Sequence, residues 1–130
     1  MYYQSLNIAE GQQGDAVLLT LSGHLTMGDS SGGLKTHLEG VVPAKGNNII
    51  INLAELTYVD SYGVGELVAC LTTIKKSGGA LRLVNPTEFV REVLHTTRLD
   101  TLFTICDTDE EAAASIARQD QADAGEQGAR

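Results

Sequence analysis

The chain has no tryptophan and few other aromatic residues, which limits how its interior can be built. Its 130 residues include four tyrosines and two phenylalanines, so that aromatic residues make up 5% of the total. Hydrophobic residues nevertheless account for 42% of the chain and charged residues for 20%, as in an ordinary globular protein. The core must therefore consist mainly of leucine, valine and isoleucine. A chain of this length has room for one domain.

Membrane, secreted and metal-cluster proteins are disfavoured by further absences. No apolar run approaches the roughly 20 residues of a spanning helix. The first ten residues, MYYQSLNIAE, lack the basic flank and apolar block of a signal peptide. We therefore expect a cytoplasmic protein with no membrane partner. Cys70 and Cys106 are too few and too far apart for a metal cluster or a disulfide framework, so we expect two buried thiols and no metal.

The charge balance argues against nucleic acid as a partner. The net charge is −8, whereas binding to a phosphate backbone requires a basic surface. An acidic chain favours a basic protein surface as partner, although solubility alone also explains the charge. His24, His37 and His95 are isolated in the sequence and are interpreted as surface or partly buried residues rather than metal ligands. No phosphate-binding loop of the form GxxxxGK[ST] is present, so no nucleotide cofactor is expected.

Apolar residues recur with a period that alternates between two and about three and a half, which is typical of an α/β domain. Strands are predicted at residues 3–8, 16–21, 48–53, 80–84 and 102–106. The first two are separated by the turn-like EGQQGD and suit a hairpin. The third, NIIINL, is apolar throughout and is predicted to be central, with both faces covered. The last is predicted to be an edge strand.

Four helices are predicted between and after these strands. The first is capped by Asp29 or Ser30 and ended by Pro43 and Gly46; the second runs from Tyr62 to the SGG at 77–79. The third follows the capping sequence NPTE at 85–88, ends at Leu94 and turns Phe89, Val90, Val93 and Leu94 inward. The fourth, AAASIAR, is opened by Asp107 and Glu110. Residues 1–117 then form the domain, and residues 118–130, which have no apolar period, are predicted to be disordered.

The sequence VDSYGVG, residues 59–65, lies between the central strand and the second helix. Its two glycines fall in the first helical turns, where each costs about 1 kcal/mol relative to alanine. Ser61 is placed at the helix N-terminus, where the helix dipole favours a phosphate by about 0.3–1 kcal/mol. Gly63 and Gly65 then admit another protein's backbone, or a nucleotide phosphate on that protein. Alternatively, Asp60 or Ser61 is only an N-cap, and the glycines relieve packing against the sheet.

DSYGVG, together with the preceding strand NIIINL and the SGHL after the second strand, resembles the STAS domain of bacterial anti-sigma factor antagonists. The motif of that family is Asp-Ser-Ser/Thr-Gly-Leu/Val-Gly. The resemblance extends over about residues 3–117. It implies one α/β domain, with a mixed sheet of four or five strands packed by about four helices.

The resemblance also implies a function and a set of site residues. Ser61 is the phosphoacceptor by position, and the unphosphorylated form binds an anti-sigma factor that is also a serine kinase. That kinase uses ATP to phosphorylate the antagonist and end the contact, and a serine phosphatase restores it. The residues expected to contact the partner are His24, Thr26, Asp29, Asp60, Tyr62, Gly63 and Gly65.

Two departures from the family pattern leave a second interpretation of the function open. Thr26 stands where many members have a carboxylate, and Tyr62 replaces a small residue beside the acceptor. The alternative is a STAS interaction module that is never phosphorylated, in a signalling scaffold or a transporter-associated complex. A hydrolase is disfavoured: Val59 occupies the first glycine position of a G-x-S-x-G nucleophile elbow, and no glycine-rich oxyanion loop is evident. We therefore expect no enzymatic activity.

Overall fold

The computed structural model describes residues 5–27 and 33–128, with side chains described through residue 119. Its centre is a five-stranded sheet in the order β1-β2-β3-β4-β5. The strands are β1 (Asn7–Gln13), β2 (Ala16–Leu25), β3 (Asn48–Val59), β4 (Ala80–Val84) and β5 (Thr104–Cys106). β1 pairs antiparallel with β2, and the remaining neighbours are parallel. The predicted α/β fold with a mixed sheet is confirmed.

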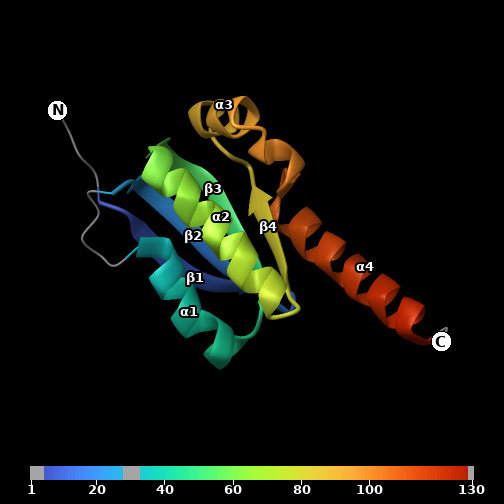
Figure 1. Cartoon of the computed structure of the whole chain (residues 1–130). Helices are drawn as coiled ribbons and strands as arrows, with labels where there is room; N and C mark the ends of the chain where they lie inside the picture. The colour runs from blue at the N-terminus through green and yellow to red at the C-terminus, as the bar shows by residue number, and fades with distance from the viewer. Residues whose placement is uncertain (1–4, 28–32, 129–130) are drawn as a thin grey trace.

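Four α-helices surround the sheet. They are α1 (Gly33–Lys45), α2 (Ser61–Lys76), α3 (Glu88–Thr96) and α4 (Asp109–Gly128), with a short 3-10 helix, η1 (Leu99–Thr101), after α3. Figure 1 shows α1 and α2 over one face of the sheet, with α3 at the end of the molecule where α2 begins. α4 lies beside β4 and points away from the body (Figure 1).

The core is aliphatic, as the composition predicts. Its main cluster joins the sheet to α1, α2 and α3 and includes the fully buried Leu19, Ile51 and Leu67. A smaller cluster on the other face packs Ala112 and Ile116 of α4 against the sheet. Burial of each large aliphatic side chain contributes about 1.5–3 kcal/mol, so the sheet and the helices packed on it hold the fold together. Both cysteines are buried, as predicted.

Four strands differ in extent from the prediction, because the turns and the polar strand ends do not follow the apolar pattern. The turn between β1 and β2 is Gly14–Asp15 alone, since Gln13 pairs directly with Ala16 and Gly14 has a φ of 61°. Residues 10–13, read as part of the turn, belong to β1 instead. β2 continues through the polar SGHL to Leu25, and β3 continues to Val59. β5, the predicted edge strand, contains only Thr104–Cys106.

The predicted helix boundaries need several corrections. α1 passes through Pro43 and ends at Lys45, because a proline near the last turn removes a single N–H donor and leaves the rest of the helix bonded. Gly46 follows with a φ of 115°, as a helix-ending glycine does. Asp29 and Ser30, the two predicted caps of this helix, both lie outside the described residues.

The two later caps are also displaced along the sequence. Thr87, not Asn85, caps α3: its Oγ1 accepts from the N–H of Val90 at 3.4 Å. Thr108, not Asp107, caps α4, with its Oγ1 accepting from the N–H of Glu111 at 3.1 Å. Each threonine was overlooked because a stronger capping residue stands one or two positions before it.

α4 is attached to the sheet by polar contacts as well as by its small apolar face. The buried Arg82 of β4 donates from Nε to Ser115 Oγ and from Nη2 to Gln119 Oε1, both at 2.7 Å. Asn52 Nδ2 of β3 donates to Asp109 Oδ1 at 2.9 Å. The helix continues to Gly128, beyond the predicted domain end at residue 117. A polar helix end without an apolar period is marginal in water, so disorder of residues 118–130 in solution remains a prediction.

Candidate functional site

Ser61 is exposed and is the first residue of α2, as predicted. Asp60 precedes it in extended conformation and is the N-cap of the helix. The Oδ1 atom of Asp60 accepts from the N–H of Gly63 at 2.8 Å, and its backbone oxygen accepts from Val64 at 2.9 Å. Of the two capping residues considered, Asp60 therefore fills the role. This leaves the hydroxyl of Ser61 at the positive end of the helix dipole, facing solvent.

Asp60 also links two loops at this end of the sheet. Its second carboxylate oxygen, Oδ2, accepts from the backbone N–H of Met27 at 3.3 Å. Its own backbone N–H donates to the carbonyl oxygen of Leu25 at 3.4 Å. The segment after β2 and the start of α2 are thus held together by one aspartate. This explains how residues 33 positions apart reach the same site.

The two glycines of the motif have different surroundings. Gly63 is buried, and a Cβ atom placed on it would lie 2.1 Å from the carbonyl oxygen of Leu25 and 2.6 Å from Cγ2 of Val59. Gly65 is exposed, and a Cβ there would meet nothing within 4 Å. Packing against the sheet explains why residue 63 is a glycine. Only Gly65 leaves open space at the surface, so its role and that of Gly63 in partner binding stay predictions.

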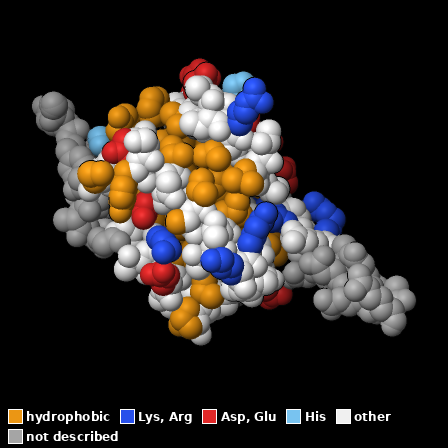
Figure 2. All heavy atoms as spheres, in the orientation of Figure 1, with side chains coloured by type: hydrophobic (Ala, Val, Ile, Leu, Met, Phe, Trp, Pro, Cys, Tyr) orange, Lys and Arg blue, Asp and Glu red, His pale blue; other side chains and the backbone are white. Residues whose placement is uncertain are grey.

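Two exposed apolar residues belong to the segments that meet at Asp60: Tyr62 follows Ser61 directly, and the backbone of Met27 is bonded to Asp60. Tyr62 is 47% exposed and Met27 is 71% exposed. Figure 2 shows hydrophobic side chains gathered at the end of the molecule where α2 begins and α3 lies, with lysine and arginine more frequent toward the other end of α2. An exposed hydroxyl within such a surface suits contact with another protein. The sequence pattern did not single out Met27, which has no motif of its own.

Thr26 is adjacent to this surface but turns its polar atom inward. Its Oγ1 is buried and has no hydrogen-bond partner among the residues that the structure describes. The carboxylate that the family pattern places here is therefore not replaced by an exposed hydroxyl. Asp29, also predicted to contact the partner, lies outside the described residues.

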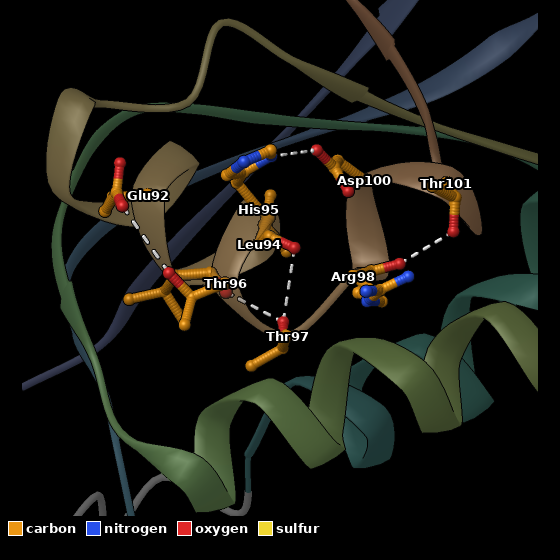
Figure 3. A network of polar contacts seen from close by, with 9 residues as sticks. Glu92, Leu94, His95, Thr96, Thr97, Arg98, Asp100 and Thr101 are labelled. Carbon is orange, nitrogen blue, oxygen red and sulfur yellow. Dashed lines mark hydrogen bonds and ion pairs between the residues drawn. The ribbon is translucent and has the colours of Figure 1, made fainter.

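Two histidines have partners away from Ser61. His24, on β2, lies edge-on to Tyr58 of β3 with ring centroids 5.4 Å apart. His95 Nδ1 lies 2.9 Å from Asp100 Oδ2, between α3 and η1 (Figure 3). This hydrogen bond and the charge of Asp100 raise the pKa of His95 above its ordinary value. Of these two, only His24 was predicted to contact the partner, and that stays a prediction.

Glu66 is a further residue that the sequence did not reveal. Its Oε1 accepts from the backbone N–H of Lys35 at 3.1 Å, so that a side chain of α2 caps the start of α1. Gly33 is adjacent, with a φ of 84°, and a Cβ there would lie 2.7 Å from the same oxygen. The helix that begins at Ser61 is thereby fixed to α1. No sequence signal identifies such a cap, because donor and acceptor lie on different helices.

The described part of the chain shows no cluster of metal-ligating side chains, and the thiol of Cys70 is held in its neutral form. No group of three or more His, Cys, Asp or Glu residues within it is placed to hold a metal ion. Burial, with a smaller effect of Glu66, raises the pKa of Cys70 to about 12, so its thiol is not ionised near neutral pH. None of the helices formed by the described residues has the length and apolar character needed to cross a bilayer.

Comparison with protein families and relatives identifies a match over most of the chain. The family model described as "STAS domain" matches residues 7–112. A protein of Thermotoga maritima, provisionally named an anti-sigma factor antagonist, is 38% identical over 73 residues. That alignment covers 56% of this chain and 65% of the relative, just under two thirds of its length.

Solved structures agree with the family match. A crystal structure of a Thermotoga maritima protein with the same provisional name superposes with a TM-score of 0.72 at 28% identity. The superposition covers 85% of this chain and 94% of that protein. The Bacillus cell fate determinant SpoIIAA in its phosphorylated form shares the fold, with a TM-score of 0.65 at 21% identity over 85% of this chain and 99% of that one.

Proposed function

Because this chain belongs to the STAS domain family, we propose that it is an anti-sigma factor antagonist whose contact with its partner is ended by phosphorylation of Ser61. The partner is an anti-sigma factor with serine kinase activity, and a serine phosphatase reverses the modification. The chain itself is not an enzyme. The observation that carries the proposal is the exposed Ser61 at the first position of α2.

A phosphate at Ser61 is compatible with the fold. It adds a charge of about −1.5 to −2 at a helix N-terminus, where negative charge is favoured by about 0.3–1 kcal/mol. The neighbouring carboxylate of Asp60 opposes it, but that side chain is already engaged with Gly63 and Met27. The two effects largely offset each other in the free protein. The phosphorylated chain therefore remains folded and accessible to a phosphatase.

The same phosphate disrupts a protein interface. Binding requires the surface around Ser61, including Tyr62 and Met27, to be desolvated, and a dianion without a cationic partner resists this. A cost of about 3 kcal/mol corresponds to a dissociation constant raised roughly a hundredfold, since each 1.4 kcal/mol is tenfold. The modification thus separates the partners and leaves the domain intact.

The test is phosphorylation by the cognate anti-sigma factor kinase. The purified chain is incubated with the kinase and ATP, and the modified residue is mapped by mass spectrometry. We expect phosphate on Ser61 and none in the Ser61→Ala variant. Ser77→Ala is the matched control, because Ser77 is an exposed serine at the opposite end of the same helix. Modification at another residue, or a complex that survives full phosphorylation of Ser61, contradicts the proposal.

A second function is favoured by the buried hydroxyl of Thr26, which offers a visiting kinase no polar contact beside Ser61. In that case the domain is an interaction module in a signalling scaffold or a transporter-associated complex and is not phosphorylated. The parent chain and the Ser61→Glu variant would then bind the partner with equal affinity. A hundredfold weaker binding of Ser61→Glu, with unchanged binding of Ser61→Ala, excludes this alternative.

A further inference from the structure

The aromatic residues in the described part of the chain lie mainly at the surface. Of the four described aromatic side chains, Phe103 alone belongs to the core, at 5% exposure. Tyr58, Tyr62 and Phe89 are 42%, 47% and 45% exposed. Phe89 was predicted to face inward, and this is wrong, because Val90 and Leu94 fill the buried side of α3. Exposed aromatic residues are enriched at the energetic centres of protein interfaces.

Tyr58 and Phe89 stack on one another. Their ring centroids are 5.3 Å apart and their planes differ by 18°. His24 also packs edge-on against Tyr58, with an angle of 60° between the two ring planes. We call Tyr58, Phe89 and His24 the aromatic platform. It joins β2, β3 and α3 in a single surface feature.

The platform is held in place by the backbone around it. Thr87 Oγ1 donates to the carbonyl oxygen of Leu56 at 3.0 Å, which fixes the start of α3 to β3 and thereby positions Phe89. β3 is irregular here, since Leu56 pairs with Gly23 but Tyr58 pairs with His24. The extra residue, Thr57, forms a β-bulge, and bulges redirect the side chains that follow them. The rings are therefore exposed in a fixed arrangement rather than on a free loop.

The bulge also brings a carboxylate to the platform's side of the sheet. Leu56 and Val59 are both buried although they are three positions apart, so Glu55 and Tyr58 share the opposite, exposed face. On α3, Glu92 is three positions after Phe89 and lies next to it on the helix surface.

The arginine of α3 does not share the helix face of Phe89. Arg91 is two positions from Phe89, a spacing at which helix side chains do not face each other. Glu92 is visible in Figure 3, where its carboxylate accepts from Thr96 at 3.5 Å. Glu55 thus shares a strand face with Tyr58, and Glu92 shares a helix face with Phe89, whereas no lysine or arginine of α3 stands three or four positions from Phe89.

We propose that the aromatic platform is a docking site for an arginine side chain of the partner protein. A guanidinium stacks on aromatic faces and forms charge-assisted hydrogen bonds with carboxylates, so it matches both features of this surface. The inference rests on the proposed function in that the partner is the anti-sigma factor. It adds an anchor that is separate from Ser61. The platform contributes affinity whether or not Ser61 is phosphorylated, whereas the phosphate disrupts the part of the interface around Ser61.

The first experiment measures binding to the cognate anti-sigma factor by calorimetry. We expect Phe89→Ala and Tyr58→Ala to bind tenfold or more weakly, as truncated interface anchors do. Leu102→Ala is the matched control, because Leu102 is an equally exposed hydrophobic residue (46%) that lines a hollow with Lys75 and Ala80, near the C-terminal end of α2, and it should bind within twofold of the parent. Phe89→Leu keeps apolar area without an aromatic face and should recover only part of the loss. Parent-like binding of both alanine variants, with circular dichroism unchanged, overturns the proposal.

The second experiment separates this proposal from the proposed function. The chain is titrated with the peptide acetyl-GRGRG-amide, followed by nuclear magnetic resonance, and the lysine peptide acetyl-GKGKG-amide is the control. Larger shifts of the Tyr58 and Phe89 ring signals with the arginine peptide support the platform even if no kinase modifies Ser61. Equal shifts with both peptides, or none, overturn it even if Ser61 is phosphorylated as proposed. Glu92→Gln should weaken the response to the arginine peptide, and raised salt should do the same.

Discussion

Replacement of Gly63 by alanine should strongly destabilise the domain. The new Cβ would lie 2.1 Å from the carbonyl oxygen of Leu25, where ordinary contacts between such atoms are about 3.5 Å. The start of α2 or the end of β2 must then move by more than 1 Å, on the order of the difference between these distances. Neither can move freely, because Asp60 bonds to both segments. Overpacking against backbone costs about 3 kcal/mol or more, and the gain in helix propensity of about 1 kcal/mol offsets only part of it.

Gly65→Ala is the matched control for this prediction. It lies in the same helix, its Cβ meets nothing within 4 Å, and alanine is favoured over glycine there by about 0.5–1 kcal/mol. The two variants should therefore differ in unfolding free energy by about 3 kcal/mol, with opposite signs relative to the parent. Urea denaturation followed by circular dichroism measures both values, and an unchanged m-value confirms that the same surface unfolds. If Gly63→Ala falls within about 0.5 kcal/mol of the parent, the close packing of α2 on β2 does not govern stability as argued.

Three further outcomes follow from individual contacts. Asp60→Ala should cost about 1–2 kcal/mol in urea denaturation, because the N-cap bond and the bond from Met27 are both lost, and Asp60→Asn should cost less. Asp100→Asn should lower the pKa of His95 toward its ordinary value in a nuclear magnetic resonance titration. Since Asp100 raises that pKa, the stabilisation by this pair is complete below the unfolded pKa of about 6.5 and is lost as pH rises through the folded value. Cys70, whose pKa is raised to about 12, should not react with iodoacetamide at pH 8 until the protein unfolds, as mass spectrometry can show.

The sequence predicted the order of strands and helices because each buried element carries a clear apolar period. NIIINL gave the central strand, and the spacing of Leu67, Leu71 and Ile74 gave the buried face of α2. Boundaries were less accurate where polar residues continue a strand, as in the SGHL of β2. In that segment the pairing between strands extends beyond the apolar core. The apolar pattern of the sequence therefore does not predict where the strand ends.

The candidate site was predicted in part. Asp60 as cap and Ser61 at the start of α2 follow from local capping chemistry, which a sequence records directly. The close approach of Gly63 to Leu25 could not be predicted in this way, because it joins segments that are distant in sequence through backbone atoms. Phe89 was misplaced for a related reason: Val90 and Leu94 fill the buried side of α3, and the ring of Tyr58, from the distant β3, stacks on Phe89 at the surface.

Most residues that stabilise this end of the sheet differ from those proposed to recognise the partner. The buried aliphatic side chains hold the elements together, whereas Ser61, Gly65, Tyr58 and Phe89 are exposed and contribute little to the core. Gly63 and Asp60 belong to both groups, because each is among the residues predicted to contact the partner and each also fixes α2 against the end of β2. A switch that works by adding charge requires this separation, because a dianion placed on a residue needed for packing would unfold the domain along with the complex. Ser61 meets the requirement since its backbone is fixed by the Asp60 cap while its hydroxyl stays in solvent.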